Sequence, residues 1–245
     1  PEIIYSQMVK ICSIGESQVA EEIQDLIEKQ TNPTIAPYAK TGEVHLRITA
    51  KGKNEKECQK LIKPVVKELK ARFGRNVFAT EESKTLEEAV VDMLKEQEMT
   101  LSLAESCTGG AIAARIVNVS GASEVFLQGM VTYSNKAKRR CLDVSKSTLK
   151  KHGAVSEECA AEMAKGGRKA AETDICLSVT GIAGPGGGTK EKPVGTVFMG
   201  CSYKGCTRVR EFHFQGNRAR VREQTVAHGL AFLRDCMMER ADKKK

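Results

Sequence analysis

The stretch 99–119, MTLSLAESCTGGAIAARIVNV, decides the fold of most of this chain. It begins with a short apolar run that has the length of a buried strand, and it ends in small and apolar residues that favour a helix. Between them AESCTGG (104–110) supplies a carboxylate, a hydroxyl, a thiol, a second hydroxyl and two glycines. A strand that turns through glycines directly into a helix predicts a layered α/β domain.

The same alternation of strands and helices continues on both sides of this stretch. We expect further helices over 84–97, 135–153, 156–172 and from Arg218 onwards. We expect further strands over 124–134, at the start of 174–188, and as a hairpin over 194–214. Together these elements predict one α/β domain over residues 83–245.

Residues 1–82 have the pattern of a separate, smaller α+β domain. We expect strands near residue 8, over 43–52 and over 76–80, and helices over 17–27 and 54–74. The segment TNPTIAPYAKTG (31–42) is punctuated by Pro and Gly and is predicted to be a loop. The polar residues 81–85 mark the expected domain boundary.

Composition excludes several classes of protein. No apolar run approaches the roughly 20 residues of a membrane span, and the first ten residues lack the basic start and apolar core of a signal peptide. The nine cysteines form no CxxC pair, and the four histidines are far apart. We therefore expect a cytoplasmic protein with no membrane association, no metal site and no disulfide framework.

The net charge of +8 leaves two kinds of partner open. Residues 1–82 carry 13 Lys or Arg and 12 Asp or Glu, so nearly all of the excess lies in the second domain. A mild basic excess suits either nucleic acid or a small ligand that bears a phosphate. Charge alone does not separate these two possibilities.

The end of the 99–106 strand offers two adjacent candidate nucleophiles, Ser106 and Cys107. A helix start presents unpaired N–H groups, which suit a phosphate or a developing oxyanion. Ser106 is our preferred nucleophile, because the residue after a strand-end nucleophile usually points into the core or begins the helix. Cys107 stays a rival, since a thiol beside a helix start can have a lowered pKa. A tight turn without chemistry is the plain alternative for this glycine cluster.

Three further motifs carry candidate groups. VTYSNKAK (131–138) contains Tyr133 and Lys136, and a buried lysine near a serine can act as a general base. LSVTGIAGPGGG (177–188) ends in Thr180 and a glycine-rich loop that can close on an anion. Arg218 and Arg222 lie four residues apart and can form a phosphate clamp. For each motif the alternative is structural: a packed tyrosine, a solvated lysine, a tight turn and an exposed charged helix face.

Taken together, these motifs resemble the CinA family. AESCTGG, VTYSN, VTGIAGPGGG followed by KPVGTV, and GNRARVREQTV look like the signature blocks of the CinA C-terminal domain, the nicotinamide mononucleotide (NMN) deamidase family, in family order over about 84–238. SIGES (13–17) and NPTIAPYAKTGEVHLRITA (32–50) look like the KH-like linker domain of the same proteins. Full-length relatives carry a further domain similar to molybdopterin-binding proteins. We therefore expect this chain to lack the pyrophosphatase activity associated with that domain.

The resemblance implies hydrolysis of NMN to nicotinic acid mononucleotide and ammonia, without a cofactor, by a homodimer. It implies Ser106 as nucleophile, Lys136 as base, Tyr133 as an assisting group, Thr180 as a hydrogen-bonding partner and Arg218 as the phosphate ligand. It also places further substrate-binding residues in the same blocks: Glu105, Cys107, Thr108, Gly109, Gly110, Asn135, Gly181, Gly184 and Arg222. The oxyanion is expected to meet N–H groups at the start of the 109–119 helix.

Two other functions compete with an amidohydrolase. The KH-like domain and the basic charge suit nucleic-acid binding, although residues 1–82 contain no GxxG loop of the kind that KH domains use. A regulatory protein that retains an inactive amidase-like site is the other alternative. The presence of all four expected catalytic side chains argues against it.

Overall fold

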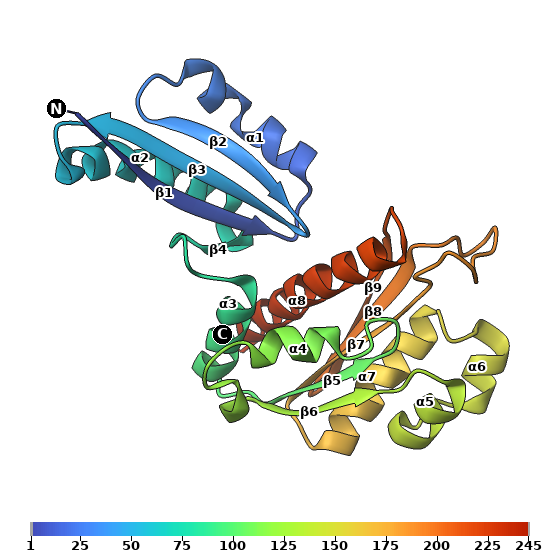
Figure 1. The fold of residues 1–245 in the computed structure, drawn as a ribbon. Coiled ribbons are helices and arrows are strands. Elements are labelled where there is room, and N and C mark those ends of the chain that lie inside the picture. The colour runs from blue at the N-terminus through green and yellow to red at the C-terminus, as the bar shows by residue number, and fades with distance from the viewer. Residues whose placement is uncertain (1, 245) are drawn as a thin grey trace. The chain divides into compact units, whose positions relative to one another are not determined.

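The structure is a computed structural model and describes residues 2–244. The chain divides into two units, residues 1–89 and 90–245, and each has its own sheet (Figure 1). We describe each unit by itself. The division falls within helix α3 (Leu86–Glu96).

The first unit is a four-stranded antiparallel sheet in the order β2-β3-β1-β4 with two helices packed on one face (Figure 1). Its strands are β1 (Ile3–Cys12), β2 (Thr34–Lys40), β3 (Glu43–Gly52) and β4 (Val77–Ala79), and its helices are α1 (Glu16–Lys29) and α2 (Glu55–Phe73). The alternation in β3 directs Val44, Leu46 and Ile48 into the core, as the sequence predicts.

The prediction of a loop over 31–42 is wrong over Thr34–Lys40. This segment forms β2 and pairs antiparallel with β3, from Thr34 opposite Thr49 to Lys40 opposite Glu43. Pro37 lies within β2 and removes one backbone donor. The sheet tolerates it because β2 is an edge strand, where one side of the backbone needs no partner strand.

The second unit is a five-stranded mixed sheet in the order β6-β5-β7-β8-β9. Its strands are β5 (Leu101–Glu105), β6 (Phe126–Val131), β7 (Ile175–Gly181), β8 (Thr196–Tyr203) and β9 (Cys206–His213). The three strands β6, β5 and β7 are parallel, and β8 and β9 add an antiparallel hairpin. This sheet confirms the predicted layered α/β fold, with the hairpin of β8 and β9 at one side of the sheet.

Helices cover both faces of this second sheet (Figure 1). They are α4 (Ala111–Val117), α5 (Asn135–Leu142), α6 (Lys146–His152), α7 (Glu157–Ala171) and α8 (Arg218–Asp242). Helix α7 packs on one face, and Gly200 of β8 allows its close approach because a Cβ there would lie 2.4 Å from the Ala160 carbonyl oxygen. Helices α4 and α8 lie on the other face, where Gly229 packs near Ile112 and Leu177.

Parallel pairing brings the carboxyl ends of β5, β6 and β7 to one edge of the sheet. Ser106 N–H donates to Val179 O (3.1 Å), and Thr132 N–H donates to Glu105 O (2.9 Å), so the chain stays aligned just beyond the strands. Polar residues that follow the three strands therefore lie side by side, which is where α/β sheets place ligand sites. No helix among residues 2–244 combines the length and the apolar character that crossing a lipid bilayer requires.

Candidate active site

A pocket of about 190 Å³ opens at this sheet edge. It is lined by Ser106, Cys107, Tyr133, Asn135, Lys138, Ala154, Val155, Thr180, Gly181, Ala183 and Arg218. Nine of these residues come from the motifs that the sequence singles out, and Ala154 and Val155 do not. Lys138 and Ala183 lie in those motifs but are not among the predicted site residues. The structure thus brings together motifs that lie up to 112 positions apart in the chain.

Ser106 lies against a buried lysine amine. Lys138 Nζ is 2.9 Å from Ser106 Oγ, and it also donates to the carbonyl oxygens of Thr132 (2.8 Å) and Tyr133 (3.2 Å). Lys138 is 1% exposed and Ser106 is 8% exposed, so both groups are largely withdrawn from bulk water. A neutral amine in this position can donate to the two carbonyls and accept the proton of the serine hydroxyl.

The structure corrects the expectation that Lys136 is the lysine beside Ser106. Lys136 is exposed, whereas Lys138 and Leu142 are the buried residues of α5. Ser134 caps this helix by accepting from the Ala137 N–H, which fixes where the helical turn begins. Because a helix turns about 100° per residue, residues four apart share a face, and residues two apart lie on nearly opposite sides.

Burial lowers the pKa of the Lys138 amine below its usual range, because desolvation disfavours the charged form. The neighbouring thiol groups of Cys159 and Cys107 act in the opposite direction. The amine therefore has an increased neutral fraction near neutral pH, as a general base for a serine requires.

Burial favours the reactive neutral form of Lys138 but disfavours the reactive thiolate form of Cys107. It is 7% exposed, and burial raises the pKa of its thiol to about 11. A thiol with this pKa carries almost no thiolate at neutral pH, and the thiolate is the nucleophilic form. This difference favours Ser106 over Cys107 as the attacking group.

Glu105 shapes the turn after β5 instead of lining the pocket. Its buried carboxylate accepts from the Thr108 hydroxyl (2.6 Å) and from the N–H groups of Ile112 (2.9 Å) and Ala113 (3.1 Å). Gly109 and Gly110 complete the turn at φ of +60° and +96°, a conformation that favours glycine. The expectation that helix-start N–H groups meet the oxyanion is therefore wrong for residues 112 and 113, whose donors are occupied.

Arg218 and Tyr133 lie at the mouth of the pocket. Arg218 donates to the Tyr133 hydroxyl (3.1 Å) and to the Gly184 carbonyl oxygen (2.8 Å). Tyr133 is 63% exposed, so it is neither a packed core residue nor a buried catalytic group. Arg218 and Ala183 also line a second hollow of about 430 Å³, together with Gly184, Pro185, Val194, Gly216, Asn217 and Ala219. A ligand longer than the first pocket can extend into this second hollow.

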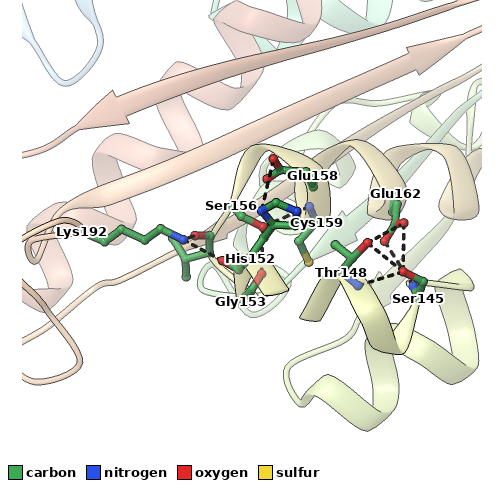
Figure 2. Close-up of polar contacts among 10 residues, drawn as sticks. Ser145, Thr148, His152, Gly153, Ser156, Glu158, Cys159, Glu162 and Lys192 are labelled. Carbon is green, nitrogen blue, oxygen red and sulfur yellow. Dashed lines mark hydrogen bonds and ion pairs between the residues drawn. The ribbon is translucent and has the colours of Figure 1, made fainter. Parts of the chain in front are cut away.

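One wall of the pocket is held by two side chains from distant parts of the chain. The Thr180 hydroxyl donates to Ala154 O (2.9 Å), and Lys192 Nζ donates to the carbonyl oxygens of His152 (2.8 Å) and Val155 (2.6 Å). Figure 2 shows Lys192 reaching the segment between α6 and α7, next to the contact between His152 and Glu158. Thr180 therefore fixes the pocket wall, and the sequence shows no signal for the part that Lys192 plays in it.

Arg222 does not line the pocket. Its guanidinium donates from Nε to Cys107 O (2.9 Å) and from Nη2 to Thr108 O (3.1 Å), on the backbone of the nucleophile turn. The predicted clamp of Arg218 and Arg222 on one phosphate is therefore not the arrangement found.

Within residues 2–244 there is also no group of three or more His, Cys, Asp or Glu side chains placed to hold a metal ion.

Solved structures of CinA proteins match part of this chain. A competence/damage inducible protein CihA from Agrobacterium tumefaciens is 39% identical, with a TM-score of 0.59 over 60% of this chain and 91% of its own. A CinA superfamily protein from Klebsiella pneumoniae is 35% identical, with a TM-score of 0.61 over 63% of this chain and 96% of its own.

Curated relatives match nearly the whole chain. A putative competence-damage inducible protein of Clostridium beijerinckii is 54% identical over 97% of this chain, and a CinA-like protein of Kosmotoga olearia is 48% identical over 96%. The chain spans 58% and 57% of the length of these two relatives.

Two family models account for almost all of the residues. The model of the Damage-inducible protein CinA KH domain matches residues 6–79, and the model of the CinA C-terminal domain matches residues 83–237. With these matches and the relatives above, the chain belongs to the CinA family.

Proposed function

We propose that the chain is an amidohydrolase that converts NMN to nicotinic acid mononucleotide and ammonia, with Ser106 as the nucleophile and Lys138 as its base. The observation that carries this proposal is the 2.9 Å contact between Lys138 Nζ and Ser106 Oγ, buried at the edge of a pocket. An amide is a poor electrophile, so covalent catalysis replaces one difficult step by two easier ones.

In the first step, neutral Lys138 accepts the proton of Ser106 as Oγ attacks the carboxamide carbon. The resulting oxyanion requires N–H donors close to Ser106, and the N–H of Cys107 makes no backbone hydrogen bond within residues 2–244. The tetrahedral intermediate then collapses, the C–N bond breaks, and ammonia leaves with the proton that Lys138 returns.

In the second step, water hydrolyses the acyl-enzyme. Lys138 takes a proton from a water molecule as the water oxygen attacks the ester carbon. It then returns a proton to Ser106 Oγ as the C–O bond of the ester breaks. The products are the free carboxylate of nicotinic acid mononucleotide and the regenerated serine.

Two hollows that share Ala183 and Arg218 in their lining offer space for the rest of the substrate. The pocket beside Ser106 has room for the carboxamide and part of the pyridine ring, and Arg218 joins it to the larger hollow at the start of α8. Arg218 can pair with a single phosphate there, consistent with the modest positive charge of the second unit. A homodimer, which the family resemblance implies, and a cytoplasmic location, which the cysteine usage suggests, remain part of this proposal.

Ammonia release from NMN tests the proposal. We expect Ser106→Ala to abolish measurable turnover and Lys138→Met to lower kcat by about 10²–10⁴-fold, the usual contribution of a general base. Lys136→Met is the matched control, because it removes a lysine from the exposed face of the same helix and is expected to keep wild-type kcat.

Three results would contradict the proposal. Wild-type protein that releases no ammonia from NMN would exclude the activity. Loss of turnover in Lys136→Met with an active Lys138→Met would reverse the choice of base. An active Ser106→Ala with an inactive Cys107→Ser would assign the attack to the thiol.

A further inference from the structure

Arg222 contacts the nucleophile turn and does not line the pocket beside Ser106. It comes from the second turn of α8, 115 positions after Cys107, and its two hydrogen bonds end on the consecutive carbonyl oxygens of Cys107 and Thr108. The guanidinium borders a separate hollow lined by Ala111, Arg115, Ala219, Arg222, Glu223 and Val226. The guanidinium is thus already hydrogen-bonded to the backbone of this chain.

These two contacts fix the direction of the peptide groups behind Ser106. A trans peptide is planar, so its N–H points opposite to its C=O. Holding Cys107 O and Thr108 O toward Arg222 therefore directs the N–H groups of Thr108 and Gly109 away from it. The Gly109 N–H indeed donates to Ser106 O at 3.1 Å, and the Thr108 N–H has no hydrogen-bond acceptor within the described part of the chain.

Glu105 holds the same turn through different atoms. Its carboxylate accepts hydrogen bonds from the Thr108 hydroxyl and from two N–H groups of α4, whereas Arg222 donates to the carbonyl oxygens. Between these two anchors lie Gly109 and Gly110, which have the largest backbone freedom of any residue type. Thr108 O also accepts from the Ala111 N–H at 3.1 Å, whereas Cys107 O is held by Arg222 from outside the turn.

We infer that Arg222 is a positioning residue for the nucleophile, not a ligand of the substrate phosphate. Its guanidinium fixes the backbone of residues 106–109, so that Ser106 Oγ stays within hydrogen-bond distance of Lys138 Nζ and the Thr108 N–H is kept available for the developing oxyanion. This inference rests on the proposed amidohydrolase function. It assigns Arg222 and Arg218, four residues apart on α8, to separate tasks.

Two substrates that differ only in the phosphate separate these tasks. With NMN and nicotinamide riboside, we expect Arg222→Gln to lower kcat by about 10–100-fold for both, since small displacements of a reacting group cost about that much. The KM for NMN should stay near the wild-type value. Arg218→Gln should instead raise the KM for NMN and affect the riboside much less, because the riboside has no phosphate to pair with this guanidinium. Arg220→Gln is the matched control, because this exposed residue of α8 pairs with Glu223.

A readout independent of the carboxamide keeps the inference testable if NMN is not the substrate. A fluorophosphonate reacts with an activated serine: Oγ bonds to phosphorus, fluoride leaves, and Lys138 receives the hydroxyl proton. We expect Ser106 to be labelled at least tenfold more slowly in Arg222→Gln than in wild type or Arg220→Gln. Wild-type protein that is labelled at Ser106 but does not hydrolyse NMN would reject the proposed function while leaving this comparison valid.

The fork geometry gives a second variant. Arg222→Lys keeps the charge but cannot bond two carbonyls in one plane, so it should lower the labelling rate as Arg222→Gln does. Millimolar guanidinium should restore labelling in Arg222→Ala by refilling the site, which separates positioning from misfolding. Wild-type labelling in Arg222→Gln, or a loss of NMN turnover with riboside turnover intact, would overturn the inference. Should Arg222→Gln fail to fold, wild-type labelling in Arg222→Lys would overturn it equally.

Discussion

Lys138 shows how strongly one side chain depends on its place in a helix. Lys136 and Lys138 are two residues apart in the same motif, yet the first is exposed and the second is 1% exposed and within 2.9 Å of Ser106. The cost of burying the Lys138 amine appears as its lowered pKa. At this scale the proposed chemistry depends on which protonation state that amine has.

The pH dependence of turnover follows from this pKa. The active form of Lys138 is neutral, so kcat/KM for NMN should rise with pH through an apparent pKa below the value of about 10.4 for free lysine. Below that pKa the amine gains a proton and activity falls. Cys107 does not titrate in this range, since its pKa is raised to about 11. A pH–rate profile that is flat, or that rises only above pH 10, would contradict Lys138 as the base.

At the scale of elements, the position of Lys138 depends on how α5 packs against α7. Gly166 of α7 faces the end of α5, where a Cβ would lie 1.7 Å from the Leu142 carbonyl oxygen. Leu142 is four residues after Lys138 on the same buried face. The contact between these helices therefore sets the position of the Lys138 amine relative to Ser106.

Gly166→Ala tests this link between packing and catalysis. The added Cβ would clash with the backbone carbonyl of Leu142, so α5 has to shift. We expect the free energy of unfolding to fall by about 1–3 kcal/mol, the usual cost of overpacking. Turnover of NMN should fall as well, because Lys138 moves with α5. Urea denaturation and ammonia release measure the two effects. Gly186→Ala serves as the stability control, because a Cβ there meets nothing within 4 Å; equal stability of the two variants would refute the argument.

At the scale of the whole molecule, each unit has the means to fold alone. The first unit has its own apolar cluster around Val9, Leu46 and Ile62, and the second has its own sheet covered on both faces. The CinA-superfamily structures with 91% and 96% of their own length matched cover only 60% and 63% of this chain. All residues of the proposed site belong to residues 90–245.

A chain that starts at the expected boundary, residues 83–245, tests this independence. We expect it to fold and to hydrolyse NMN with the kcat/KM of the full chain, because the first unit contributes no residue to the pocket. Circular dichroism and ammonia release provide the measurement. A folded but inactive fragment would show that residues 1–82 take part in catalysis.

Much of the fold follows from local patterns in the sequence. The order of strands and helices in the second unit depends on periodicity, and the strand that ends at Ser106 is recognisable from its apolar run and its glycines. The loop predicted over 31–42 fails for a physical reason, since Pro37 argues against a strand unless the strand lies at an edge. Whether a strand lies at an edge depends on pairing with residues far along the chain.

The sequence by itself determined the α/β layers, the family, and the motifs whose side chains meet at one sheet edge, because these depend on short-range periodicity and on residue type. Only the tertiary structure decided which lysine reaches Ser106, that Glu105 and Arg222 hold the turn, and that Lys192 supports the pocket wall. Each of those contacts joins atoms from separate elements, and its geometry depends on helix phase and packing. A linear motif specifies which groups are present but not the direction in which the packed helices point them.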